Sequence, residues 1–178
     1  MPFPRKEEPD MNKNTYKEYR LDPVFEDVHS GGITNSTELK TDVCSYFLDW
    51  YKNLQTDEPL YSHFDILDHL IYAPNMMLLK VIGQGLYEYR IQGEVIYDLV
   101  GKRNQGKIFS AKNELPYLAR LANYLDEIAA SRTLVHSYGK LTSHDRPHLS
   151  VEALAMPLYK NSGSISHLLS VMAPINPD

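Results

Sequence analysis

Residues 76–93, MMLLKVIGQGLYEYRIQG, decide the fold of this chain. Residues 76–82 are apolar except for Lys80, and residues 86–91 alternate between two sets of side chains. Between these runs, Gly83-Gln84-Gly85 supplies the glycines that favour a tight turn. Two extended runs joined by such a turn predict a β-hairpin.

The residues after the hairpin predict two helices and three further strands. Residues 94–100 fit a short helix that ends at Gly101, and Asn113 can cap a longer helix with Pro116 in its first turn. The β pattern then returns in three segments, which are residues 133–142, 148–159 and 165–172. Because the connections between these segments are short, we expect them to form an antiparallel meander.

The segment that precedes the hairpin predicts an amphipathic helix over residues 39–54. Large apolar side chains recur there at spacings of three and four residues, and they are Leu39, Val43, Phe47, Trp50 and Leu54. Asn35 or Ser36 is placed to cap this helix. The apolar face either covers the core of its own domain or pairs with a second copy, so these five residues form a candidate homodimer interface.

The rest of the N-terminal region divides into a second helix and a tail. A capping-box pattern at residues 62–65 predicts a short helix that Pro74 stops. Residues 1–35 combine charges and prolines without a sustained apolar period, which predicts a mostly disordered tail. We therefore expect N-terminal helices over residues 36–74 and one domain over residues 75–175.

These elements predict an α+β fold, with a five-stranded antiparallel sheet, helices on one face and an N-terminal amphipathic helix. Several local motifs accompany the order of elements, and they are Trp50, Pro59, Phe64-Asp65-Ile66 before Leu70, residues 87–93, residues 101–106, Pro157-Leu158 and Asn161-Ser162-Gly163. With these motifs, residues 38–173 resemble the PAS-like family of single-domain proteins common in alphaproteobacteria. The order of two strands, helices and three strands is also that of a PAS domain.

The resemblance implies a sensory or interaction module, in which a cupped sheet and its helices enclose a small cavity. Six side chains are candidates for binding a ligand there, and they are Tyr87, Tyr89, Arg90, Tyr97, His136 and His167. A simpler interpretation gives the tyrosines and histidines hydrogen-bonded places in the core, and gives Arg90 a structural ion pair. No kinase, cyclase or DNA-binding segment is recognised, so we expect the output to be intermolecular.

The cofactors of known PAS types are disfavoured by the residues that they require. Residues 93–112 contain no cysteine for a covalent flavin adduct, and residues 114–131 contain no histidine to ligate haem. His144 and His148 are four residues apart but flank a predicted turn, so a metal site there is disfavoured. The sequence does not identify a cofactor.

Composition narrows the class of protein. The 178 residues are 43% hydrophobic and carry a net charge of −5, which fits one globular domain and argues against a nucleic-acid binder. Cys44 is the single cysteine, so an internal disulfide is excluded. The sequence shows neither a secretory signal at its start nor a run long enough for a membrane span, and we expect a cytoplasmic protein.

One loop has a concentration of positive charge. Residues 101–112 contain Lys102, Arg103, Lys107 and Lys112 and no acid. This loop either contacts a nucleotide messenger or an acidic partner, or it is a solvated loop.

Three functional hypotheses follow. The first is a non-enzymatic PAS-like sensor or adaptor, acting as a homodimer that binds a small ligand or a regulatory protein and controls signalling in trans. The second is a small cone-shaped α+β enzyme that acts on a hydrophobic molecule with a Tyr/Asp or Tyr/His pair. The third is an interaction scaffold with a filled core.

Overall fold

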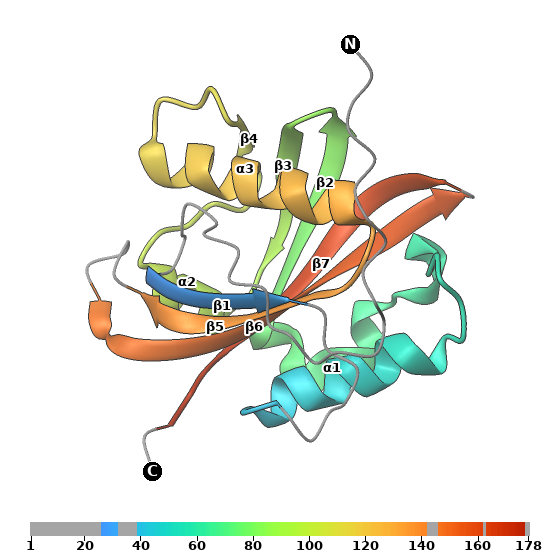
Figure 1. Ribbon diagram of the computed structural model, residues 1–178, viewed down its shortest axis with the longest axis horizontal. Coiled ribbons are helices and arrows are strands. Elements are labelled where there is room, and N and C mark those ends of the chain that lie inside the picture. The colour runs from blue at the N-terminus through green and yellow to red at the C-terminus, as the bar shows by residue number, and fades with distance from the viewer. Residues whose placement is uncertain (1–25, 32–38, 142–145, 162, 177–178) are drawn as a thin grey trace.

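The computed structural model describes residues 26–31, 39–141, 146–161 and 163–176. In this part of the chain, seven strands form one antiparallel sheet in the order β1-β5-β6-β7-β2-β3-β4 (Figure 1). The strands are β1 Glu26–Gly31, β2 Met76–Gly83, β3 Leu86–Gln92, β4 Ile108–Ser110, β5 Val135–Leu141, β6 Arg146–Asn161 and β7 Ser164–Pro174. The helices are α1 Asp42–Asn53, α2 Glu94–Val100 and α3 Pro116–Ser131, with 3-10 segments η2 Tyr61–His63 and η3 Ile66–Asn75.

The predicted hairpin is confirmed and lies inside the sheet. Strands β2 and β3 pair antiparallel, with Val81 opposite Tyr87, and Gly85 in the turn has a φ of 66°. Strand β2 also pairs with β7, so the N-terminal hairpin joins the C-terminal meander. The predicted α+β fold class is therefore confirmed.

The sheet has two more strands than the five that the sequence predicted. Strand β1 pairs with β5 at one edge, and the three-residue β4 pairs with β3 at the other. The expected tail over residues 1–35 thus includes a strand, because residues 26–31 hydrogen-bond to an available sheet edge. The rest of the predicted tail, residues 1–25 and 32–35, lies outside the described residues.

Helices cover both faces of the sheet. On one face, α2 and α3 bury Ile96, Leu118 and Leu125 with strand residues such as Leu79. On the opposite face, α1 and η3 pack over a second core that includes Phe47, Leu78, Leu154 and Leu169. The N-terminal helix therefore covers its own domain, which was one of the two alternatives that its pattern left open.

The first helix begins later than the sequence suggested. Thr41 is its N-cap, and the hydroxyl oxygen of Thr41 accepts a hydrogen bond from the backbone N–H of Cys44 at 3.3 Å. Asn35 and Ser36, the expected caps, lie outside the described residues. No helix in the described ranges is both long and apolar enough to span a bilayer.

A close backbone approach joins the end of η3 to the end of β3. A Cβ added at Gly93 would lie 2.1 Å from the carbonyl oxygen of Pro74, so only glycine fits here without a backbone shift. The N–H of Gly93 also donates to the carbonyl of Met76 at 2.8 Å.

The second predicted helix is the 3-10 segment η3. Asp65 caps it, and Pro74 lies in its last turn.

Candidate functional site

The two tyrosines that the sequence placed at a cavity are part of the core. Tyr87 is 1% exposed and Tyr89 is 4% exposed, and both rings pack against Phe109. The hydroxyl of Tyr87 donates to the carboxylate of Asp126 at 2.5 Å. Burial, and then this hydrogen bond, raise the pKa of Tyr87 above its usual value. These side chains fill the space between the sheet and α3 instead of bordering an open cavity.

Asn104 is a buried polar residue that sequence reasoning missed. Its side-chain oxygen accepts hydrogen bonds from the hydroxyl of Tyr117 at 2.9 Å and from the ammonium of Lys107 at 3.0 Å. Its backbone N–H donates to the side chain of Gln92 at 2.6 Å. This network joins the basic loop to the end of β3, and an asparagine two residues before Gly106 was the one signal for it in the sequence.

Most cations of the basic loop already have partners within the domain. The ammonium of Lys102 lies 4.1 Å from the ring centroid of Tyr117, and the guanidinium of Arg103 lies 4.2 Å from that of Tyr97. Arg103 also pairs with Glu94 at 3.3 Å. The predicted ligand residue Tyr97 therefore supports this loop, and the loop charges are not gathered around a pocket.

His136 and Glu152 form a buried acid–base pair beneath the start of α1. Nε2 of His136 lies 2.8 Å from Oε1 of Glu152, and both residues have 0% exposure. The carboxylate also accepts from the N–H of Lys40 and the hydroxyl of Thr41, each at 2.8 Å. Burial raises the pKa of Glu152, but these hydrogen bonds together hold it below its usual value. The pair ties the helix cap to the sheet and does not face a pocket.

The side chains proposed for a homodimer interface are occupied by contacts within the chain. Phe47 has 0% exposure and Val43 has 9%. Leu39 and Trp50 pack against the same core, and Leu54 is half-buried at the C-cap of α1. A dimer through the buried part of this face would require α1 to leave the sheet, so the interface stays a prediction, and within one chain the face is part of the core.

A second buried histidine lies in the aromatic cluster under α1. His69 is 2% exposed, its Nδ1 lies 2.9 Å from the hydroxyl of Tyr46, and its ring stacks with Phe64. Burial lowers the pKa of His69, because a low-dielectric setting disfavours the charged ring. This histidine is a packed core residue.

The remaining two predicted ligand residues lie on the face of the sheet opposite α3. Arg90 is exposed and forms an ion pair with Glu88 at 3.0 Å. His167 is half-buried, its ring stacks on Tyr61 with a centroid distance of 3.7 Å, and its Nδ1 lies 3.0 Å from the hydroxyl of Ser166. Arg90 and His167 therefore belong to one surface region, which the sequence analysis did not identify.

His167 lines a surface pocket of about 460 Å³, which we call the basic pocket. It lies between η2, β2 and the end of the β6–β7 hairpin, and its lining residues are Tyr61, Ser62, Lys80, Val81, Tyr159, Lys160, Ser166 and His167. Burial, and then the charges of Lys80 and Arg90, lower the pKa of His167 to about 4. The electrostatic potential at this ring is therefore positive, and His167 is neutral near pH 7.

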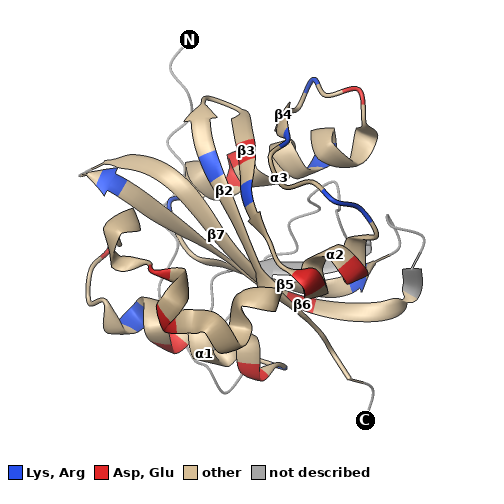
Figure 2. Cartoon of the chain, turned by 180° about the vertical axis from the view of Figure 1, so that it is seen from behind, with Lys and Arg blue, Asp and Glu red and all other residues tan. Residues whose placement is uncertain are grey.

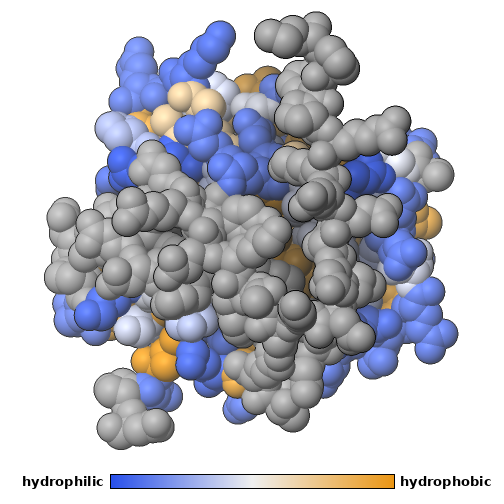
Figure 3. Space-filling model, in the orientation of Figure 1, coloured by the Kyte–Doolittle hydropathy of each residue, from blue (hydrophilic) through white to orange (hydrophobic). Residues whose placement is uncertain are grey.

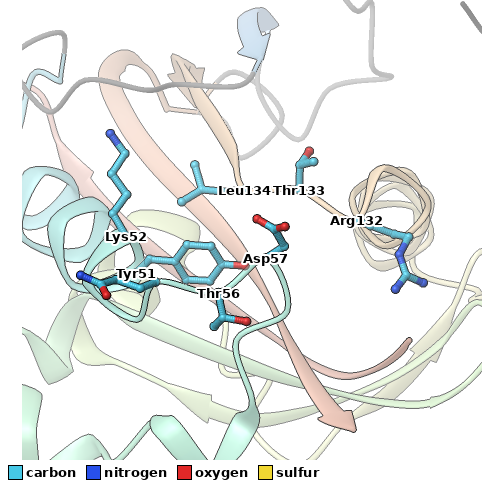
Figure 4. A pocket seen from close by; sticks show the side chains of 8 residues that line it. Tyr51, Lys52, Thr56, Asp57, Arg132, Thr133 and Leu134 are labelled. Carbon is cyan, nitrogen blue, oxygen red and sulfur yellow. The ribbon is translucent and has the colours of Figure 1, made fainter. Parts of the chain in front are cut away.

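Another surface pocket of about 490 Å³ lies between the end of α1 and the start of β5 (Figure 4). Asp57, Tyr51 and Leu134 line it, and Arg132 stands apart from Asp57 in this view. The guanidinium of Arg132 is bound by Glu58 at 2.8 Å and by the carbonyl of Gly163 at 3.1 Å. Arg132, a cation that lines this pocket, therefore already has partners within the protein. We take the basic pocket as the candidate binding site.

The described residues contain no group of three or more side chains that could hold a metal ion. His144, one of the two turn histidines considered above, lies outside the described residues.

Comparison with known proteins gives one result. A family model described as a PAS domain matches residues 50–173. No curated protein and no solved structure matches the chain.

Proposed function

The chain belongs to the PAS domain family, and from this premise we propose that it is a non-enzymatic sensory or adaptor module. It binds a small ligand or a protein partner and regulates a second protein in signalling. The family match supports the general role of a sensory or interaction domain, and the geometry of the sheet supports a surface for that role.

The observation that carries the proposal is an uncovered half of one sheet face. Helix α1 packs over one part of this face, whereas β2, β3 and the adjoining end of β7 are open beside it (Figure 2). Lys80 and Arg90 are exposed there, and Ile82 is 44% exposed. We call this region the open half of the sheet. Figure 3 shows the other side of the molecule, where the described residues that are visible beside the grey atoms are mostly hydrophilic.

The positions of the acid–base pairs support a binding role over an enzymatic one. The small-enzyme alternative needs a Tyr/Asp or Tyr/His pair in a cavity, and Tyr87 with Asp126 is such a pair. However, Tyr87 is enclosed by the core, and the pair formed by His136 and Glu152 is also fully buried. Neither pair lines either of the two surface pockets.

The packing of α1 offers a route from binding to output. The start of α1 is hydrogen-bonded through Thr41 to Glu152 of the sheet, and its apolar face shares a core with β2 and β7. A ligand on the open half that prefers one packing arrangement of α1 shifts the population of that arrangement. The surface formed by α1 and the open half then changes, and with it the affinity for a partner that contacts both.

The proposal is tested by comparing two matched variants in an affinity capture from cells of the source organism. Ile82→Asp places a charge on the open half, and Leu115→Asp places the same charge at the start of α3, on the opposite face of the sheet, where Leu115 is 45% exposed. We expect the wild-type chain and L115D to retain a stoichiometric signalling protein that I82D loses, while all three unfold at similar temperatures. Equal retention by I82D and L115D, or turnover of a metabolite by the wild type, would contradict the proposal.

A further inference from the structure

We propose that the basic pocket binds the phosphate group of a small organic phosphate. The inference deepens the proposed function, because it assigns a chemical class of ligand to the open half of the sheet.

The first support is an excess of uncommitted positive charge. Lys80 and Lys160 both line the pocket and both are exposed, and neither forms an ion pair with a described residue. Glu88 stands opposite Lys80 in the pairing of β2 with β3, but its carboxylate is held by Arg90 at 3.0 Å. None of the residues that line the pocket is acidic, so two ammonium groups are available to a dianion.

The second support is the response of His167 to this charge. After burial, which is the largest cause, Lys80 and Arg90 both lower the pKa of His167. Arg90 is not among the lining residues, so its charge acts at longer range. An anion bound beside His167 would offset this potential.

The third support is the set of uncharged groups around the two lysines. Ser62 contributes a hydroxyl that can donate to a phosphate oxygen, whereas the hydroxyl of Ser166 donates to the carbonyl of Leu158 at 3.4 Å. Tyr61, which is 39% exposed and stacked on His167, adds an aromatic wall. A volume of about 460 Å³ lies within the range of small-molecule sites, so the pocket has room for an organic group beside the phosphate.

The test is a calorimetric titration of the full chain with phenyl phosphate at pH 7.5 and constant ionic strength. We expect saturable binding that Lys80→Gln and Lys160→Gln each weaken by about fivefold, the loss expected for one exposed charge-assisted contact. Lys112→Gln, which removes a charge outside the pocket, serves as the control and leaves the affinity unchanged. Phenol is expected to give no measurable binding, since it lacks the phosphate.

A second readout excludes binding elsewhere on the protein. Saturating phenyl phosphate is expected to raise the pKa of His167 from about 4, as followed by NMR of the imidazole protons. Equal weakening by K80Q and K112Q, an unchanged pKa of His167, or no saturable binding would overturn the inference. If I82D still loses its partner in that case, the proposed function stands and only the phosphate site fails.

Discussion

The carboxylate of Glu152 lies 2.8 Å from Nε2 of His136, and the same carboxylate accepts the first hydrogen bonds of the segment that opens α1. One buried charge therefore joins β5, β6 and the N-terminal cap of the helix. In the proposed function, binding changes how α1 packs on the sheet. The pair of His136 and Glu152 holds the start of α1 in its position on the sheet.

Replacing Glu152 by Gln is expected to destabilise the domain by about 2–4 kcal/mol, because one partner of a buried, hydrogen-bonded pair loses its charge. The free energy of unfolding in urea at pH 7 measures this change. Glu94→Gln is the control, since Glu94 takes part in an ion pair whose side chains are more than half exposed. An effect of E152Q as small as that of E94Q would show that the buried pair contributes little.

The same variant changes the acid response of the protein. Hydrogen bonds lower the pKa of Glu152 in the folded state, so its contribution to stability is present above its usual pKa of 4.5 and is lost as pH falls through the folded-state value. We expect the stability of E152Q to fall less steeply below pH 4.5 than that of the wild type. Parallel curves for the two proteins would contradict this account.

Phe47→Ala is expected to cost about 3–5 kcal/mol without changing the molar mass of the folded protein in sedimentation. Phe47 is fully buried against the sheet of its own chain, so its loss leaves a cavity and removes no contact between copies. Leu67→Ala, at a side chain that is 67% exposed, should change stability by less than about 0.5 kcal/mol. A molar mass of F47A that is half that of the wild type would support a homodimer through this face.

Gly93→Ala is expected to lower stability by about 3 kcal/mol or more, because the new Cβ would overlap the carbonyl of Pro74 and force the backbone apart. Gly83→Ala provides a matched control, since a Cβ there has no atom within 4 Å. Thermal and urea unfolding of both variants check the difference. Equal stability of G93A and G83A would mean that η3 and β3 are packed less closely at this junction.

An NMR titration of His167 is expected to give a pKa of about 4, and Lys80→Gln should raise it, because Lys80 disfavours the charged ring. Since the unfolded chain binds this proton more readily than the folded one, His167 reduces stability as pH falls from its usual pKa of 6.5 toward 4. A pKa that K80Q leaves unchanged would show that the lysine does not act on the pocket.

Periodicity predicted the fold well and the site poorly. The alternation of Tyr87 and Tyr89 identified a strand, because side chains on a strand alternate with a period of two. It did not identify which face has open space, because that depends on how tightly α3 and Phe109 pack over the tyrosines. The apolar face of α1 likewise looked the same for a core and for a dimer.

The two features on which the site depends arise from contacts between distant residues. The basic pocket combines Tyr61, Lys80, Lys160 and His167, which meet only after β2 pairs with β7 and η2 packs beside them. Strand β1 is short and polar, and it becomes a strand through the edge of β5. Glu152 is the one charged residue in the run 149–159, and the sequence analysis missed this signal of a buried partner.

The central claim is that binding takes place on the open half of the sheet and not between the sheet and α3. The most direct test is a map of backbone amide chemical shifts for the full-length chain titrated with phenyl phosphate. We predict saturable shifts at Ser62, Lys80, Ser166 and His167, with the amides of Tyr89, Leu118 and Leu125 unchanged. Shifts centred on Tyr89, Leu118 and Leu125, with His167 unaffected, would contradict the account.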